Sequence, residues 1–282
     1  MPTFNTPEPI TANVQLDLGT VEVIAGDRAD TVVEVRPSSA SSESDRKAAE
    51  KTEVTYSHGK LLIRGPKQRP SSFRKGGSIH VQISVPTGSA VHGSSAMADL
   101  SCEGRIGECR FETQYGNIRV DESGALSVTT SHGDVDVRRA VGRSDISGCG
   151  RVRIGEIDGP AVISNVNGDT NAADVTGNLR VTAANGAISV GRAHADVRAE
   201  TAAGAIRVDE VMRGTVVLES SVGALDVGVR GGTAVSLETG TLSGRVRNGL
   251  DAVWPADVLR KSDDTVRVSA VTGVGDITVR RV

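Results

Sequence analysis

A short phrase that begins with glycine recurs through the chain at a near-constant interval. Successive glycines lie 17 to 19 residues apart, and the clear copies of the phrase begin at Gly116, Gly133, Gly150, Gly168, Gly186, Gly204 and Gly223. Looser copies follow at Gly244 and Gly275. A fixed period of this length is typical of proteins built from stacked repeats, in which each repeat contacts only its neighbours. The spacing therefore constrains the fold more than any other feature of the sequence.

Side chains alternate in character within each copy of the phrase. The second and fourth residues after glycine are aliphatic, as in Ile188 and Val190, with Thr170 as the polar exception. The third residue is polar in every copy. Successive side chains of a β-strand point to opposite faces, so the pattern predicts one buried and one exposed face. A second strand, marked by residues such as Val181 and Leu218, precedes each glycine.

These patterns predict an all-β fold, a single-stranded, β-helix-like β-solenoid over residues 90–282. A closely related rack of hairpins is the alternative chain path. Residues 1–89 predict a short N-terminal antiparallel β region, with a mobile basic loop at 66–78 and about two turns of helix near Arg46–Lys51. If the units stack consecutively, Arg119, Asp136 and Arg153 become vertical neighbours of alternating charge, which favours that order.

The composition limits the kind of core and the class of partner. Aromatic residues make up only 2% of the 282 residues, so the core is expected to be thin and filled by small aliphatic groups. The net charge of −3 argues against binding of nucleic acid. The segment after Met1 lacks the basic and apolar stretches of a signal peptide, and the three cysteines form no CxxC pair. These features predict a cytoplasmic protein with reduced thiols.

Acidic residues on the repeats are the candidates for catalysis. Asp134 and Asp169 occupy the same column two units apart, with Arg151 between them. Two carboxylates about 5–10 Å apart can cleave a sugar bond, so a carbohydrate-active β-helix enzyme is an alternative hypothesis. The column continues with Ala187 and Ala205, which predicts that no acidic cleft extends along the stack. We therefore expect no enzymatic activity.

No cofactor or metal ion is expected from the sequence. The five histidines are scattered and lack the spacing of a metal site. The segment Asn165–Asn171 is similar to a calcium loop, but it lacks the terminal bidentate glutamate and falls on the repeat turn. His132, two residues before Asp134, is expected to be a turn residue exposed to solvent.

Two segments that the repeat does not explain are the candidate partner-binding sites. The basic loop and a late interruption of the repeats supply Lys67, Arg69, Phe73, Arg74, Lys75 and Trp254. We expect the loop to contact a protein partner, and an anionic membrane surface is the second candidate, since each basic residue near such a surface adds about 1 kcal/mol. Trp254 is expected to cap the open end of the stack or, alternatively, to anchor a partner.

The chain resembles a known family of bacterial repeat proteins. The period, the Gly-Asp/Ala-aliphatic-x-Val phrase and the Val-Ser or Val-Thr strand before it resemble the toast-rack family over roughly residues 90–282, and more weakly in the N-terminal strands. The resemblance implies a β-repeat architecture and supplies no catalytic residues. Members are often labelled candidate adhesins, and many are attached to membranes, whereas no run near 18 apolar residues occurs here. We expect a non-enzymatic scaffold or binding protein, with an enzyme and a surface adhesin as alternatives.

Overall fold

The computed structural model describes residues 1–66, 76–250 and 265–282. The chain divides into two compact units, Met1–Val141 and Gly142–Val282. Each unit is built from β-strands, and one short helix lies in the first unit. Among the described residues, no helix has both the length and the apolar character needed to cross a membrane.

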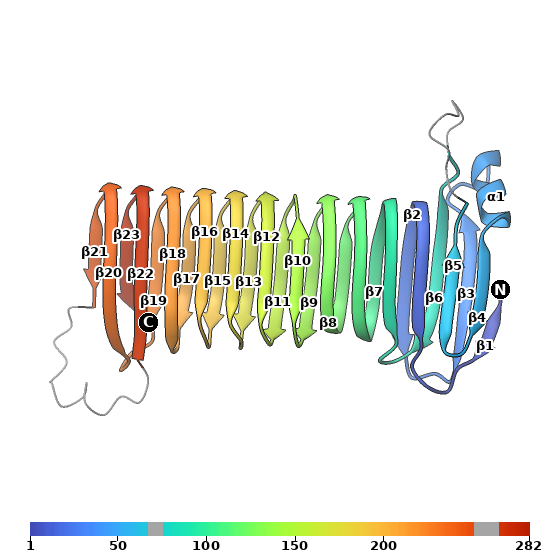
Figure 1. Cartoon of the computed structure of the whole chain (residues 1–282), viewed down its shortest axis with the longest axis horizontal. Helices are drawn as coiled ribbons and strands as arrows, with labels where there is room; N and C mark the ends of the chain where they lie inside the picture. The colour runs from blue at the N-terminus through green and yellow to red at the C-terminus, as the bar shows by residue number, and fades with distance from the viewer. Residues whose placement is uncertain (67–75, 251–264) are drawn as a thin grey trace. The chain divides into compact units, whose positions relative to one another are not determined.

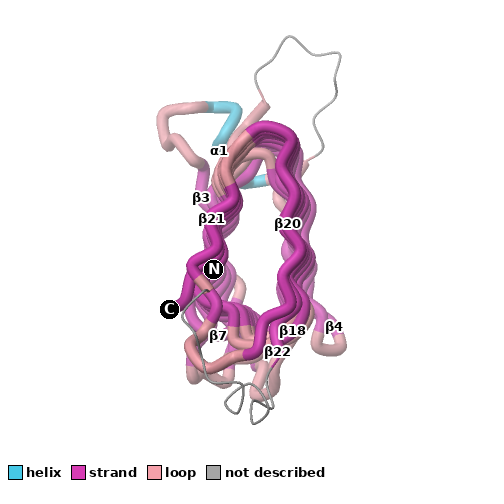
Figure 2. The backbone as a smooth tube through the Cα atoms, turned by 90° about the vertical axis from the view of Figure 1, so that its left-hand side faces the viewer, coloured by secondary structure: helices cyan, strands magenta, loops and turns pink. Residues whose placement is uncertain are grey.

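The second unit is a β-solenoid with two walls of parallel strands (Figure 1). One wall consists of β10 (Ser144–Gly148), β12 (Ala161–Asn167), β14 (Leu179–Asn185), β16 (Val197–Ala203), β18 (Gly214–Val222), β20 (Ala234–Ser243) and β22 (Thr265–Val274). The other consists of β11 (Val152–Asp158), β13 (Thr170–Val175), β15 (Ile188–Ala193), β17 (Ile206–Val211), β19 (Leu225–Val229), β21 (Val246–Gly249) and β23 (Ile277–Arg281). Viewed along the stack in Figure 2, β20 and β21 lie on opposite sides of one elongated coil. The predicted solenoid is therefore confirmed.

The thin core lies between these walls and follows the predicted columns. The second residues after glycine stack in register, for example Thr170 on Ile188 and Ile188 on Ile206, and each is at most 1% exposed. The fourth residues form a parallel buried column that includes Val190 and Val208. Because every position repeats on the neighbouring coil, each aliphatic side chain has like neighbours above and below, which compensates for the lack of aromatic residues.

The repeated glycine is required by contact between successive turns. Gly186 has a φ of +127° and Gly204 a φ of +154°, in a region that L-residues rarely adopt. An added Cβ on Gly204 would lie 2.0 Å from the carbonyl oxygen of Gly186 on the preceding coil. The phrase therefore begins with glycine both for backbone conformation and for space.

The order of the coils departs from consecutive stacking at the C-terminal end. Strand β22 pairs with β18 on one side and β20 on the other, and β23 pairs likewise with β19 and β21. The last coil of the chain is thus inserted between the two coils that precede it (Figure 1). The inserted coil buries Val268 and Ile277 fully, whereas the outer coil leaves Val246 45% exposed and carries Asn248 in an inward column. The more apolar coil takes the place with two neighbours, which explains why the consecutive order predicted from the sequence is wrong here.

The first unit contains a parallel part and a short antiparallel part. Its elements are β1 (Thr3–Asn5), β2 (Thr11–Gly26), β3 (Asp30–Pro37), α1 (Glu43–Glu50), β4 (Glu53–Ser57), β5 (Lys60–Arg64), β6 (Ile79–Pro86), β7 (Ala90–Tyr115), β8 (Ile118–His132) and β9 (Val135–Val141). Strand β2 pairs in parallel with β5, β6 and β7, and β8 pairs in parallel with β7 and β9. The antiparallel pairs are β1–β3, β3–β6 and β4–β5.

Several predictions for the N-terminal region can be compared with these pairings. Strands β4 and β5 form an antiparallel hairpin, and His58 and Gly59 in its turn both have positive φ values. Helix α1 overlaps the predicted helix and is capped by Ser42, whose side chain accepts the backbone N–H of Asp45. Strands β2 and β3 are neighbours along the chain in the region that the sequence predicts to be antiparallel, but they do not pair with each other, because β6 lies between them. Strand β6 is buried along its whole apolar face and needs a partner on both sides.

Candidate functional site

The partner-binding residues predicted from the sequence lie outside the described parts of the chain. These residues are Lys67, Arg69, Phe73, Arg74, Lys75 and Trp254. A candidate site must therefore be sought on the surface of the residues that the structure describes.

One of the two carboxylates considered for catalysis, Asp169, holds neighbouring turns together. Asp169 Oδ1 accepts the backbone N–H of Ala187 on the next coil at 3.0 Å. The same position in the first unit repeats this contact, since Asn117 Oδ1 accepts the N–H of Asp134 at 2.9 Å. The side chains of Asp169 and Asn117, each directly after a repeat glycine, thus connect two coils, which gives Asp169 a structural role.

The segment that is similar to a calcium loop is also part of the turn. Asn165 is 3% exposed, and its side-chain amide donates to the carbonyl oxygens of Gly150 and Gly168, both at 2.9 Å. In the first unit, the ring of His132 stacks on Tyr115 with 4.6 Å between ring centroids. Within residues 1–66, 76–250 and 265–282, no group of three His, Cys, Asp or Glu side chains is arranged to hold a metal ion.

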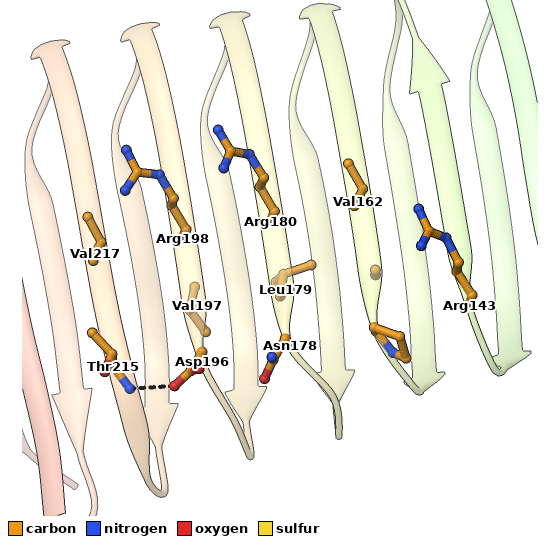
Figure 3. A pocket seen from close by; sticks show the side chains of 12 residues that line it. Arg143, Val162, Asn178, Leu179, Arg180, Asp196, Val197, Arg198, Thr215 and Val217 are labelled. Carbon is orange, nitrogen blue, oxygen red and sulfur yellow. Dashed lines mark hydrogen bonds between the residues drawn. The ribbon is translucent and has the colours of Figure 1, made fainter.

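A groove lies on the outer face of β12, β14, β16 and β18 in the second unit (Figure 3). Its volume is about 400 Å³, within the usual range for ligand pockets. The strand register places Val162, Arg180, Arg198 and Val217 in one outward column across these strands. Arg143, just before β10, extends the groove at one end. The outward column therefore has two arginines in its middle and a valine at each end.

The arginines of the groove are charged and only partly neutralised. Arg198 donates to Glu200 and also lies 3.3 Å from Glu219, and the hydrogen bond to Glu200 raises the pKa of the guanidinium. Arg180 lies 3.7 Å from Glu200 and is 55% exposed in its side chain. Two guanidiniums on adjacent strands repel each other, and they share Glu200 as a partner. An added anion near Arg180 would relieve this repulsion.

The remaining polar groups of the groove take part in the turn. Asp196 is the only carboxylate among the described residues that line it, and its Oδ1 accepts the backbone N–H of Thr215 at 2.8 Å. Arg143 pairs with Asp145 at 2.9 Å, and this hydrogen bond raises the pKa of Arg143. The groove offers apolar contact and cationic hydrogen-bond donors, and it lacks a pair of facing carboxylates.

The groove is built on the strand before each glycine, whereas the columns predicted from the sequence belong to the strand after it. The strand before each glycine carries its own outward column, and that column contains Val162 and Val217 where a solvent-facing position usually has a polar residue. Aligning residues at the same 18- or 19-residue spacing would have shown two valines beside two arginines. The depth of the groove depends on the lengths of side chains that lie next to each other on adjacent strands. It can therefore be predicted only when the register of these strands is known.

Comparison with known proteins gives the family. The Toastrack DUF4097 model matches residues 13–247. The chain belongs to this family. No functionally curated protein matches the sequence.

The chain is similar to several solved structures at low sequence identity and low TM-score. A protein from Clostridium sporogenes, provisionally named a cell adhesion protein, is 11% identical, with 100% of this chain and 98% of that chain covered and a TM-score of 0.30. A provisionally named adhesin from Bacteroides fragilis is 9% identical (100% and 95% covered, TM-score 0.32). A provisionally named lipid binding protein from Parabacteroides distasonis is 12% identical (100% and 95% covered, TM-score 0.34). At these identities the likeness of the toast-rack chain to the three proteins concerns the fold alone.

Proposed function

We propose that this toast-rack protein is a non-enzymatic binding protein whose groove holds an extended, acidic segment of a protein partner. The observation that carries the proposal is the outward column in which Val162 and Val217 flank Arg180 and Arg198. Exposed valine favours contact with aliphatic side chains of a ligand. Guanidiniums bind carboxylates through two parallel hydrogen bonds, which gives specificity for acidic side chains.

The geometry of the groove fits a short stretch of extended chain. Neighbouring strands are about 4.8 Å apart, so the three spacings from β12 to β18 cover about 14 Å. An extended peptide rises about 3.3 Å per residue, so about four residues occupy this length. Because only alternate side chains of an extended chain face the same side, the ligand expected from the column carries acidic side chains at alternate positions, opposite Arg180 and Arg198, next to aliphatic residues.

The chemistry of the groove favours binding over catalysis. A glycosidase needs two carboxylates across the bond that it cleaves. Here Asp196 stands alone among the described lining residues and accepts a backbone N–H. Arginine stays protonated and does not serve as a general base. Proton transfer therefore has no suitable donor and acceptor pair in this groove.

A display library of eight-residue peptides tests the proposal. The full-length protein should enrich peptides with two acidic residues flanked by aliphatic ones, and fluorescence polarisation should then give the affinity of one enriched peptide. The double variant Arg180→Ala, Arg198→Ala should weaken binding at least about tenfold, because each charge-assisted hydrogen bond contributes about 1.5–3 kcal/mol.

Arg207→Ala is the matched control, since Arg207 is an exposed arginine paired with Asp209 on the opposite wall of the same unit. Its binding should stay within about twofold of the unchanged protein. Enrichment of basic peptides, or equal loss in the control, would contradict the proposal. Binding to vesicles of phosphatidylglycerol that depends on Arg180 and Arg198, without binding to any peptide, would assign the groove to a membrane instead.

We further propose that the protein works in the cytoplasm, where the basic loop with Lys67 and Arg74 adds a second contact to the partner. The three free cysteines support this location. A maleimide that does not cross membranes should label Cys149, which is partly exposed, only after cells are lysed. Labelling in intact cells would place the protein on the outside.

A further inference from the structure

A second groove, in the first unit, has a different lining. It lies on the outer face where β5, β2 and β7 run side by side, and it has a volume of about 480 Å³. Its floor is formed by the small residues Ser94, Ser95 and Ala96 of β7. Long polar side chains stand on both sides of this floor.

The register of the strands explains the shape of this groove. Gln15 on β2 pairs with Ser94 and, on its other side, with Arg64 of β5. Ser95 Oγ lies 3.0 Å from Thr113 Oγ1, which places the later part of β7 along the other side of the floor. One wall therefore carries Gln15 and Asp17, and the other carries Glu112 and Gln114. The two walls are two strand spacings apart, about 10 Å, with only serine and alanine between them.

Most of the strand backbone at this site is already paired within the described residues. Strand β2 pairs with β5 as far as Gln15 and with β7 along the groove, and the later part of β7 pairs with β8. A bound peptide therefore has little free strand edge to extend. Recognition must come from side chains, which favours a ligand that carries many hydrogen-bonding groups of its own.

The side chains of the groove are rich in hydrogen-bond acceptors. Glu112 offers carboxylate oxygens, Gln15 and Gln114 offer one amide oxygen and one amide NH₂ group each, and Asp17 adds a second negative charge to the lining. Ser94 adds a hydroxyl group that both donates and accepts. Arg64 Nε donates to Gln15 Oε1 at 3.4 Å and so orients this glutamine at the end of the groove. A ligand that matches this lining presents several donors that can also accept, as hydroxyl groups do.

We propose that this groove binds a neutral sugar chain. Sugar hydroxyls can donate to the four acceptor side chains on the two walls and accept from the glutamine amides and from Ser94. Two carboxylates and one arginine disfavour anions such as an acidic peptide or a phosphate. Leu16 is the only large aliphatic residue among the described residues that line the groove, which leaves little apolar surface for an acyl chain. The site is separate from the groove with Arg180, so each proposal stands or fails without the other.

The test uses the full-length protein and a panel of neutral tetrasaccharides of glucose, mannose, xylose and N-acetylglucosamine, with binding measured by isothermal titration calorimetry. Ser94→Trp fills the floor of the groove and should weaken binding of the best tetrasaccharide at least about tenfold. Ser101→Trp is the matched control, because Ser101 is another outward-facing serine of β7, in the part that pairs with Glu22 and Arg119. The control should bind within about twofold of the unchanged protein.

Three results would overturn the assignment. The first is that no tetrasaccharide binds at concentrations up to about 10 mM. The second is that Ser94→Trp binds as well as Ser101→Trp. The third is that spermidine binds in the groove while every sugar fails, because the carboxylates would then select a cation. Circular dichroism of both variants, unchanged from the parent, would show that any loss of binding arises in the groove and not from misfolding.

Discussion

Replacing Gly204 by alanine tests how closely the coils of the second unit approach one another. The new Cβ would lie 2.0 Å from the carbonyl oxygen of Gly186 and 2.6 Å from its carbonyl carbon, and both atoms belong to the backbone of a packed coil. The φ of +154° adds conformational strain, which costs about 1–3 kcal/mol for a non-glycine residue. Since the backbone cannot move away as a flexible side chain would, we expect a total loss of at least about 4 kcal/mol in the free energy of unfolding.

Two other glycines of the same unit separate strain from contact. Gly142 has a φ of +110° but no atom within 4 Å of an added Cβ, so Gly142→Ala should lose only the cost of strain, about 1–3 kcal/mol. Gly240 has open space and an ordinary φ, so Gly240→Ala should change stability by less than about 0.5 kcal/mol or stabilise slightly.

Urea unfolding, followed by far-ultraviolet circular dichroism, measures the series. With a slope of about 3 kcal/mol per molar urea, Gly204→Ala should lower the midpoint by more than about 1 M. The order of loss should be Gly204 first, then Gly142, then Gly240. If Gly204→Ala and Gly142→Ala unfold at the same midpoint, the carbonyl of Gly186 does not stand where the structure has it, and the account of the repeated glycine is refuted.

Three further predictions concern thiols, a turn and the last coil. Ellman's reagent should react with Cys149 in the native protein, and with Cys102 and Cys109 only in urea, because these two are buried. The hydrogen bond from Cys109 and the burial also raise the pKa of Cys102. Rapid reaction of three thiols without urea would contradict the burial. Asn165→Ala should cost about 2 kcal/mol in urea unfolding because two partly buried carbonyl oxygens lose their donor, and a change below about 0.5 kcal/mol would show that the turn does not need it. Removal of residues 265–282 should abolish cooperative unfolding of the second unit, since this segment lies between two other coils; an unchanged melting curve would place it at the end of the stack.

The periodic part of the fold was predictable because each position in the repeat has one environment. A residue such as Ile188 meets its own counterparts above and below, so a column of residues gives burial directly. Arg119 and Asp136 are register partners in the first unit, as the predicted alternation of charge requires. The order of the last coils was not predictable in this way. Every copy of the phrase fits beside every other copy, and the more apolar coil takes the inner place, so that Ile277 is buried while Val246 of the outer coil is 45% exposed.

The candidate sites were less predictable than the fold. The sequence predicts binding sites at residues that the repeat does not explain, such as Lys67 and Trp254. These residues lie outside the described parts of the chain. The two grooves instead arise within regular strands, where a short side chain such as Ser94 or Val162 stands beside longer ones on adjacent strands. Such depressions depend on which strands are neighbours. In the first unit this neighbourhood joins β5 to β2, a parallel pairing that local alternation does not reveal.

The most direct test of the proposed function is site-specific photocrosslinking in cells. A photoreactive phenylalanine derivative placed at Val217 lies in the groove beside Arg198, and the same derivative at Arg207 lies on the opposite wall. Mass spectrometry of the crosslinked product identifies both the partner and the segment that touches the groove. We expect Val217 to crosslink to an extended segment rich in acidic residues and position 207 to give no such product. Equal crosslinking from both positions, or crosslinks from Val217 to basic segments, would contradict the central claim.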